Sequence, residues 1–73
     1  MTDDIRLLQS VAITVDKPAH GLVRGQVGTV VEELAPGVFE VEFSDQSGKA
    51  YAFAPVRQAE MIVLHHDPVR AAG

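Results

Sequence analysis

Apolar and polar residues alternate along much of the chain from residue 11 onward. Side chains with this period point to opposite faces of a β-strand, and the β-branched residues that dominate these segments favour that conformation. The pattern predicts strands over residues 11–15, 27–34, 38–43, 49–54 and 60–65. Before them, Ile5, Leu7 and Leu8 give only a weak helical signal. The sequence therefore predicts an all-β protein.

The segments between the predicted strands carry turn signals. Pro36 and Gly37 suit a type II turn, because proline fixes φ at the first central position and glycine accepts the positive φ of the second. Residues 17–25 are predicted to form a loop that Leu22 and Val23 anchor to the core. The second and third strands should therefore form a tight hairpin, with a longer loop before it.

The third predicted strand has the clearest two-sided pattern. Phe39, Val41 and Phe43 share one face, and Glu40 and Glu42 share the other. A strand that packs on a core with one face and meets water with the other shows this alternation. We predict that the two phenylalanines point inward and the two glutamates outward.

The second and fourth predicted strands are less regular. Val30 and Val31 are adjacent, so both can face the core only if the strand contains a bulge. Gly28 indicates a bend or a close approach of another backbone. In the fourth strand Tyr51 and Phe53 share a face, which we assign either to the core or, for the tyrosine, to a peptide-binding groove.

Pro55 is predicted to end the fourth strand, and residues 56–59 fit a single helical or 3₁₀ turn. The chain has 73 residues, of which 47% are hydrophobic. A flat sheet of this size would bury too little, whereas closure into a barrel covers most strand edges. We predict a small five-stranded SH3-like barrel over residues 11–65, with one short helical turn before the last strand. Residues 1–10 are its lead-in and 66–73 a flexible C-terminal tail.

Composition excludes several functions. The absence of cysteine rules out disulfides, zinc–thiolate sites, iron–sulfur clusters and thiol nucleophiles. Six basic and ten acidic residues give a formal charge of −4, which argues against a nucleic-acid backbone as the main partner. No secretory leader or membrane span is evident, so we expect a cytoplasmic protein. We expect no cofactor.

Part of the chain resembles known families. Residues 24–32, followed by the hairpin to residues 38–43, resemble the KOW-type core of SH3-like barrels. Residues 8–64 resemble more closely a family of very small bacterial proteins of unknown function. The shared patterns are Val-x-Ile-x-x-Asp from Val11, Gly-Leu-x-x-Gly-x-x-Gly-Thr-Val-Val from Gly21, and Phe-Glu-Val-Glu-Phe from Phe39. That resemblance implies an SH3-like fold, and its members look like partners of small toxin-like proteins encoded beside them.

The chain departs from KOW modules that bind RNA, which carry basic residues around the glycine loop. Here that region offers only Arg24 and, further away, Lys17. Four glutamates dominate the neighbouring hairpin instead, and they are Glu32, Glu33, Glu40 and Glu42. We interpret these four either as a solvated surface or as a docking strip for a basic protein, because clustered like charge steers association.

Other candidate chemistry is weak. His65, His66 and Asp67, with His20, are metal-ligand residue types, but adjacent residues of a strand point to opposite faces and no further ligand has a recognisable spacing. The paired glutamates lack the buried pocket that acid–base catalysis needs. We therefore expect no enzyme and no metal site.

The sequence favours a non-catalytic protein-interaction module. Such a module would be an accessory, antitoxin-like or immunity-like partner of a small basic protein. One candidate for that basic protein is the product of a neighbouring gene. Two alternatives stay open at this point. One is a KOW-like nucleic-acid-binding module, and the other is a self-associating structural barrel in which residues 27–31 and 61–64 pair across a two-fold axis.

Overall fold

The computed structural model describes residues 5–68, which form one antiparallel sheet of five strands. The strands are β1 (Ser10–Ile13), β2 (Val27–Ala35), β3 (Val38–Ser44), β4 (Ala50–Arg57) and β5 (Met61–Val63). Two 3₁₀ turns accompany them, η1 (Pro18–His20) between β1 and β2 and η2 (Gln58–Glu60) between β4 and β5. The predicted all-β fold, with five strands and a helical turn before the last, is confirmed.

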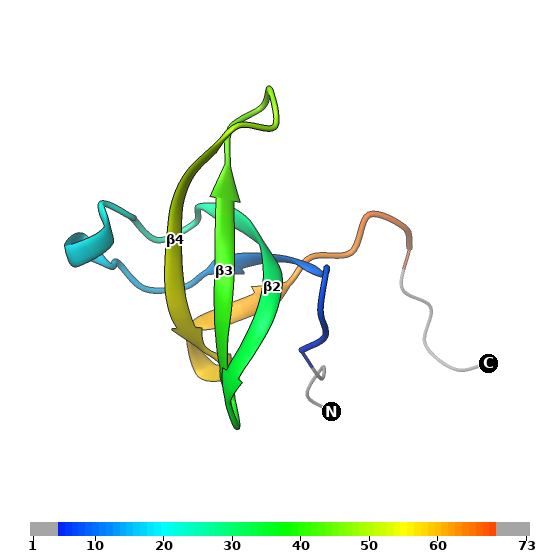
Figure 1. The fold of residues 1–73 in the computed structure, drawn as a ribbon. Helices are drawn as coiled ribbons and strands as arrows, with labels where there is room; N and C mark the ends of the chain where they lie inside the picture. Colours follow the sequence, from blue (N-terminus) through cyan, green and yellow to red (C-terminus); the bar gives the residue numbers. More distant parts are fainter. Residues whose placement is uncertain (1–4, 69–73) are drawn as a thin grey trace.

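The sheet is curled, so that its two ends lie on opposite sides of the core. The strand order is β4-β3-β2-β1-β5, and β2 is long enough to pair with β3 along most of its length and with β1 at its start. Figure 1 shows β4, β3 and β2 side by side at the front, with β1 and β5 crossing behind them. The inner faces of both groups of strands therefore enclose one hydrophobic core.

The core consists of inward-facing side chains from all five strands and one loop residue, Leu22. Among residues 5–68, no polar or charged side chain is buried. Full burial of a large aliphatic or aromatic side chain contributes about 1.5–3 kcal/mol. The buried residues are Val11, Ile13, Leu22, Val30, Phe39, Val41, Phe43, Ala54, Val56 and Met61. The predicted inward positions of Phe39 and Phe43 are confirmed.

The irregularity predicted in β2 is present. The register passes from Val30 opposite Val41 to Glu32 opposite Glu40, which leaves Val31 as the extra residue of a bulge. Val30, which lies before the bulge, is fully buried, and Val31 is half-buried.

Gly28 lies where β2 passes close to β3. A Cβ atom at this position would be 2.5 Å from Cγ1 of Val41 and 2.8 Å from the carbonyl oxygen of Glu42. Both distances are shorter than a carbon atom tolerates, so the strands can approach this closely only if the residue has no side chain. The predicted close approach at this glycine is confirmed.

The hairpin between β2 and β3 turns at Gly37, whose φ of 76° lies in the left-handed region that glycine adopts readily. The carbonyl oxygen of Gly37 accepts a hydrogen bond from the N–H of Gln58, at 2.8 Å. The tip of the hairpin is thus fixed to η2.

Two predictions about β4 are wrong. The strand does not end at Pro55 but continues to Arg57, because β4 is an edge strand and an edge tolerates a residue that donates no backbone hydrogen bond. Tyr51 and Phe53 do not face the core, since they are 49% and 52% exposed. Small residues occupy the inner positions instead, with Ala52 opposite the large Phe43.

The ends of the described chain also differ from expectation. Residues 5–9 contain a turn rather than a helix, and Leu8 has a positive φ of 69°. Its N–H donates to the carbonyl oxygen of Val30 at 2.6 Å, which ties the lead-in to β2. Of the two residues predicted to anchor the first loop in the core, Leu22 is buried and Val23 is 59% exposed. Residues 69–73 of the predicted tail lie outside the described residues.

Candidate functional site

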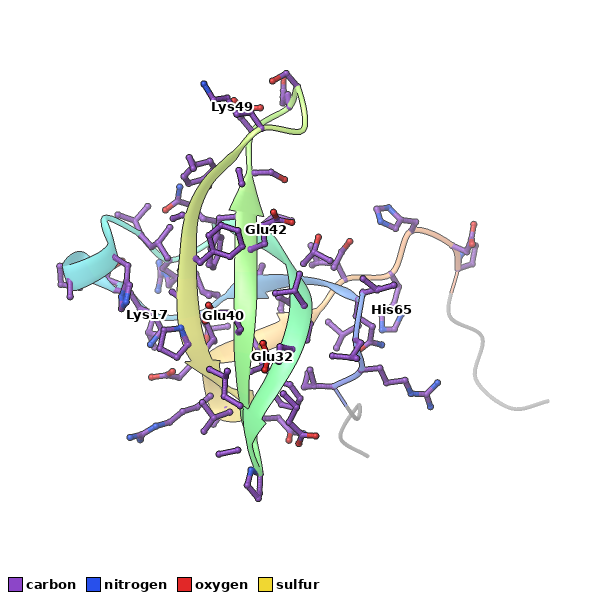
Figure 2. All side chains as sticks on the ribbon, in the orientation of Figure 1. Lys17, Glu32, Glu40, Glu42, Lys49 and His65 are labelled. Carbon is purple, nitrogen blue, oxygen red and sulfur yellow. The ribbon has the colours of Figure 1, made fainter. Side chains whose placement is uncertain are left out.

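The outer side of β2, β3 and β4 carries three of the four predicted glutamates. Glu32 on β2 lies directly opposite Glu40 on β3, and Glu42 follows two residues further along β3. Figure 2 shows these three side chains on the same side of the sheet. Glu32 is exposed, and the other two are half-buried. We call Glu32, Glu40 and Glu42 the acidic face.

Glu33 does not belong to this face. It lies opposite Phe39, whose side chain points into the core, and it is exposed near the end of the hairpin. The bulge at Val31 explains the difference, because a regular register continued from Val30 would place Val31 opposite Glu40 and Glu32 opposite Phe39. The structure thus brings together three of the four predicted residues.

Positive charge also lies on this side of the sheet. Arg57 ends β4 opposite Val38, so it shares the outer side with Pro55 and Glu40. Lys49 precedes β4 in the β3–β4 loop (Figure 2). Lys17 is paired with Glu60, with 3.0 Å between its Nζ and the carboxylate Oε1. Among residues 5–68, no hydrogen bond or salt bridge engages the three carboxylates of the acidic face. Like charges directly opposite each other on neighbouring strands are destabilising.

Apolar side chains border the acidic face along β4. Phe53 lies opposite Glu42 and Pro55 opposite Glu40, and both are exposed. Exposed aromatic side chains beside charged groups are typical of protein–protein interfaces, where the aromatic ring supplies contact area and the charges supply orientation. Sequence reasoning missed this border, because it assigned Phe53 to the core.

The loop that contains η1 is fixed to the open edge of β4 by Gln26. Its side-chain oxygen accepts a hydrogen bond from the N–H of Val23 at 2.7 Å, and its side-chain nitrogen donates to the hydroxyl of Tyr51 at 3.0 Å. The ring of Tyr51 lies 6.5 Å from that of Phe43, at 46°. No sequence signal marked Gln26 as a structural residue. His20 and Arg24, also on this loop, are exposed.

Three other carboxylates of residues 5–68 have structural partners, and the first is Asp16, which accepts a hydrogen bond from the N–H of Arg24 at 2.8 Å. The N–H of Arg57 and the ammonium group of Lys17 both donate to Glu60, and they hold its pKa below the ordinary value. In the β3–β4 loop, the hydroxyl of Ser47 and the backbone N–H of Lys49 donate to Asp45 and lower its pKa likewise. These acids stabilise local structure, in contrast to those of the acidic face.

The residues with metal-ligand side chains do not gather. Within residues 5–68, no group of three or more histidine, aspartate or glutamate side chains is arranged to hold a metal ion. His20 lies in η1, whereas His65 and His66 follow β5 and are exposed. In the same part of the chain, no helix is long and apolar enough to cross a membrane.

The chain matches one known family. The family described as "Domain of unknown function (DUF4926)" matches residues 7–63, which include all five strands. This match covers most of the chain, so the chain belongs to that family. No curated protein and no solved structure matches it. The prediction of a family of unknown function is confirmed.

Proposed function

We propose that this member of the DUF4926 family is a non-catalytic protein-interaction module that binds a small basic protein on its acidic face. It acts in the bacterial cytoplasm as an accessory, antitoxin-like or immunity-like partner. The observation that carries this proposal is the placement of Glu32 opposite Glu40, with Glu42 beside them and no hydrogen bond or salt bridge to these three carboxylates within residues 5–68.

The fold relationship forms part of the same proposal. We assign the curled sheet to the SH3-like barrels, with a KOW-like hairpin formed by β2 and β3. The strand order, in which β1 lies between β2 and β5, and the 3₁₀ turn before β5 support this assignment. A fold of this kind does not by itself imply a function, so the argument for binding depends on the surface.

The energetics of the acidic face favour a bound cation. Two carboxylates held opposite each other repel, and a lysine or arginine side chain placed between them converts that repulsion into attraction. Exposed ion pairs contribute only about 0.2–1 kcal/mol each, so charge alone would give weak binding. Phe53 and Pro55 add apolar contact area along one side of the same face.

The decisive experiment is capture of a basic partner by charge-reversal variants. The protein is co-expressed with the product of the neighbouring gene, and the complex is isolated at low and at physiological salt. We expect Glu40→Lys and Glu42→Lys each to reduce the captured amount, and the double variant to abolish capture. Association should also become slower as salt rises, because screening weakens long-range steering.

Asp67→Lys is the matched control. It makes the same change in net charge as either single variant, and Asp67 lies in the exposed segment after β5, away from the acidic face. Capture should be unchanged in this variant. If the double variant kept its partner, or if Asp67→Lys lost it equally, the acidic face would not be the docking surface.

The nucleic-acid alternative has a separate test. A KOW-like RNA-binding module should bind mixed RNA at low salt with a steep salt dependence, because phosphate contacts release counterions. We expect no such binding from a protein of formal charge −4 whose central hairpin is acidic. RNA binding with that salt dependence would favour the alternative over our proposal.

A further inference from the structure

The open edge of β4 carries backbone groups that the sheet does not use. β4 is the first strand in the order β4-β3-β2-β1-β5, so only its edge toward β3 is paired. In an antiparallel strand, the N–H and C=O groups of successive residues point alternately to the two edges. Every second residue of β4 therefore directs both groups away from β3. An unpaired strand edge is a template for pairing with another chain.

Hydrogen bonds on the other side of β2 show which residues of β4 these are. The N–H of Val30 donates to Gln9 and its C=O accepts from Leu8, so both groups point away from β3. Val41 lies opposite Val30 and must direct its own groups toward β4, where it pairs with Ala54. Ala54 is thus bonded to β3, and the residues before and after it face the open edge.

Phe53 and Pro55 are these two residues. The missing N–H of Pro55 costs the sheet no hydrogen bond, as expected for a position that faces an open edge. Within residues 5–68, the N–H and C=O groups of Phe53 have no hydrogen-bond partner. Arg57, the next residue that faces outward, donates its N–H to the side chain of Glu60. The free stretch of the edge is therefore centred on Phe53.

We propose that the basic partner adds an extended segment to this edge, pairs with the backbone of Phe53 and places a lysine or arginine beside its ring. The inference rests on the proposed function, because it specifies how the partner reaches the acidic face. In strand addition, main-chain hydrogen bonds supply affinity and side chains supply specificity. Figure 1 shows the loop that contains η1 passing behind β4 and extending beyond its edge, so this loop lies on the inner side of the added segment.

The free edge is too short to bind by backbone pairing alone. The register between β3 and β4 shifts after Phe43, which leaves Tyr51 as the extra residue of a bulge. A bulge ends regular pairing, and Pro55 offers an acceptor without a donor. These two features fix the register of an added segment around Phe53, and they require its side chains to contribute to binding.

Charge determines which side chains fit beside this edge. Phe53 lies opposite Glu42 on the outer side of the sheet, and within residues 5–68 that carboxylate has no hydrogen bond or salt bridge. The residue that pairs with Phe53 has its side chain on the same outer side, about 4.8 Å further from β3. A lysine or arginine there lies along the half-exposed ring and directs its charged end toward Glu42. An acidic residue in that position would be repelled.

A second copy of the chain does not suit this edge. Antiparallel pairing of two β4 strands about Phe53 would place Lys49 of one copy beside Arg57 of the other, so like charges would meet at both ends. The two acidic faces would also lie on the same outer side, in chains that each carry a formal charge of −4. The observations therefore favour a basic segment over self-association.

The first test uses the wild-type chain and a capped hexapeptide in which valine and lysine alternate. The peptide is added up to about 1 mM, the weak end of specific binding, and amide hydrogen exchange is followed by NMR. Exchange at Phe53 should become about twofold slower when half of the protein is bound, because its N–H gains an acceptor. Exchange at Ala54, which is already bonded to β3, should not change. Unaltered exchange at Phe53 would overturn the proposal.

Two methylated peptides test the backbone pairing at constant charge. A strand pairs with its neighbour through the N–H groups of alternate residues only, so methyl groups on the backbone nitrogens of the valines and of the lysines block opposite edges of the peptide. One methylated form should bind at least about tenfold more weakly, and the other should bind like the unmodified peptide. Equal affinity of the two forms would overturn strand addition.

Two variants test the choice of a basic segment. Glu42→Gln should weaken binding of the unmodified hexapeptide several-fold, whereas Glu33→Gln, which makes the same change in charge outside the acidic face, should not. If Glu42→Gln has this effect but the methylated forms bind equally, strand addition is wrong and the proposed function stands. If the methylated forms differ but the two variants bind alike, the acidic face does not select the segment, and the proposed basic occupant is wrong.

Discussion

Replacement of Glu40 by lysine should make the fold more stable while it disables the proposed docking surface. Glu40 lies directly opposite Glu32 and two residues from Glu42 on the same outer face of the sheet. Its side chain is only half-buried, so a lysine of similar length fits without a change in packing. The substitution turns two repulsive interactions into attractive ones.

The expected gain follows from Coulomb's law. Two unit charges about 6 Å apart in water interact by about 0.7 kcal/mol, and a Debye length of about 8 Å at physiological salt roughly halves this value. Replacing Glu40 by lysine removes the repulsion from Glu32 and adds an attraction of the same size, so the total change for this pair is about 0.7 kcal/mol. Glu42, about 7 Å along the strand, adds a smaller amount in the same direction. Arg57, the diagonal neighbour of Glu40 on β4, opposes it by a similar amount, because a lysine at position 40 would repel it. The free energy of unfolding should therefore rise by about 0.7 kcal/mol, which corresponds to a melting temperature higher by about 3–6 °C.

Thermal and urea denaturation followed by circular dichroism would measure this gain. Glu33→Lys is the matched control, because it makes the same change of charge on the neighbouring residue, which lies opposite Phe39 rather than opposite an acid. The control should show a smaller gain, due only to the lower net charge. At about 1 M salt, where the Debye length falls to about 3 Å, the difference between the two variants should disappear.

Two results would refute this reasoning. Equal stability of Glu40→Lys and Glu33→Lys at low salt would mean that Glu32 and Glu40 do not repel across the strands. A difference that persists at high salt would mean that its cause is not electrostatic. Either result would also remove the energetic argument for a bound cation on the acidic face.

The remaining predictions concern the packing and the polar contacts that hold the sheet together. Gly28→Ala should lower the free energy of unfolding by about 2–3 kcal/mol in urea denaturation, because the added methyl group collides with β3, and a neutral effect would contradict the close approach seen here. Glu60 has a lowered pKa, so its contacts with Lys17 and with backbone N–H stabilise the fold above its ordinary pKa of 4.5 and are lost as the pH falls through the lower, folded value. Glu60→Gln should accordingly flatten the loss of melting temperature below about pH 4.5, and an unchanged acid profile would exclude this role. Tyr51→Phe removes the hydrogen bond from Gln26 and should cost about 0.5–1 kcal/mol, with faster amide hydrogen exchange in the loop that contains η1. Unchanged exchange there would mean that the bond does not hold the loop.

The sequence predicts local structure most reliably where a single physical requirement determines which face of a strand is buried or which residue can form a turn. In β3 the strict alternation leaves only one assignment of faces, and at Gly37 only a residue that tolerates positive φ completes the turn. In β4 both faces carry apolar residues, so the pattern does not determine which one is buried. The pairing with β3 decides it: Ala52 lies opposite the large Phe43 and Ala54 opposite Val41 on the inner side, where small residues fit and Tyr51 would not. That competition for volume is not visible along the chain.

The candidate site depends on the same kind of competition. The two adjacent valines predict a bulge, but its consequence for the glutamates becomes clear only from the paired strands. The extra residue, Val31, turns the following residues by one position relative to β3. Glu32 thereby leaves the inner side, where it would have faced Phe39, and lies opposite Glu40 on the outer side. The pairing of Glu32 with Glu40 thus depends on the bulge, so a change that restored the regular register of Val30 along the rest of β2 would move Glu32 from the acidic face to the inner side of the sheet.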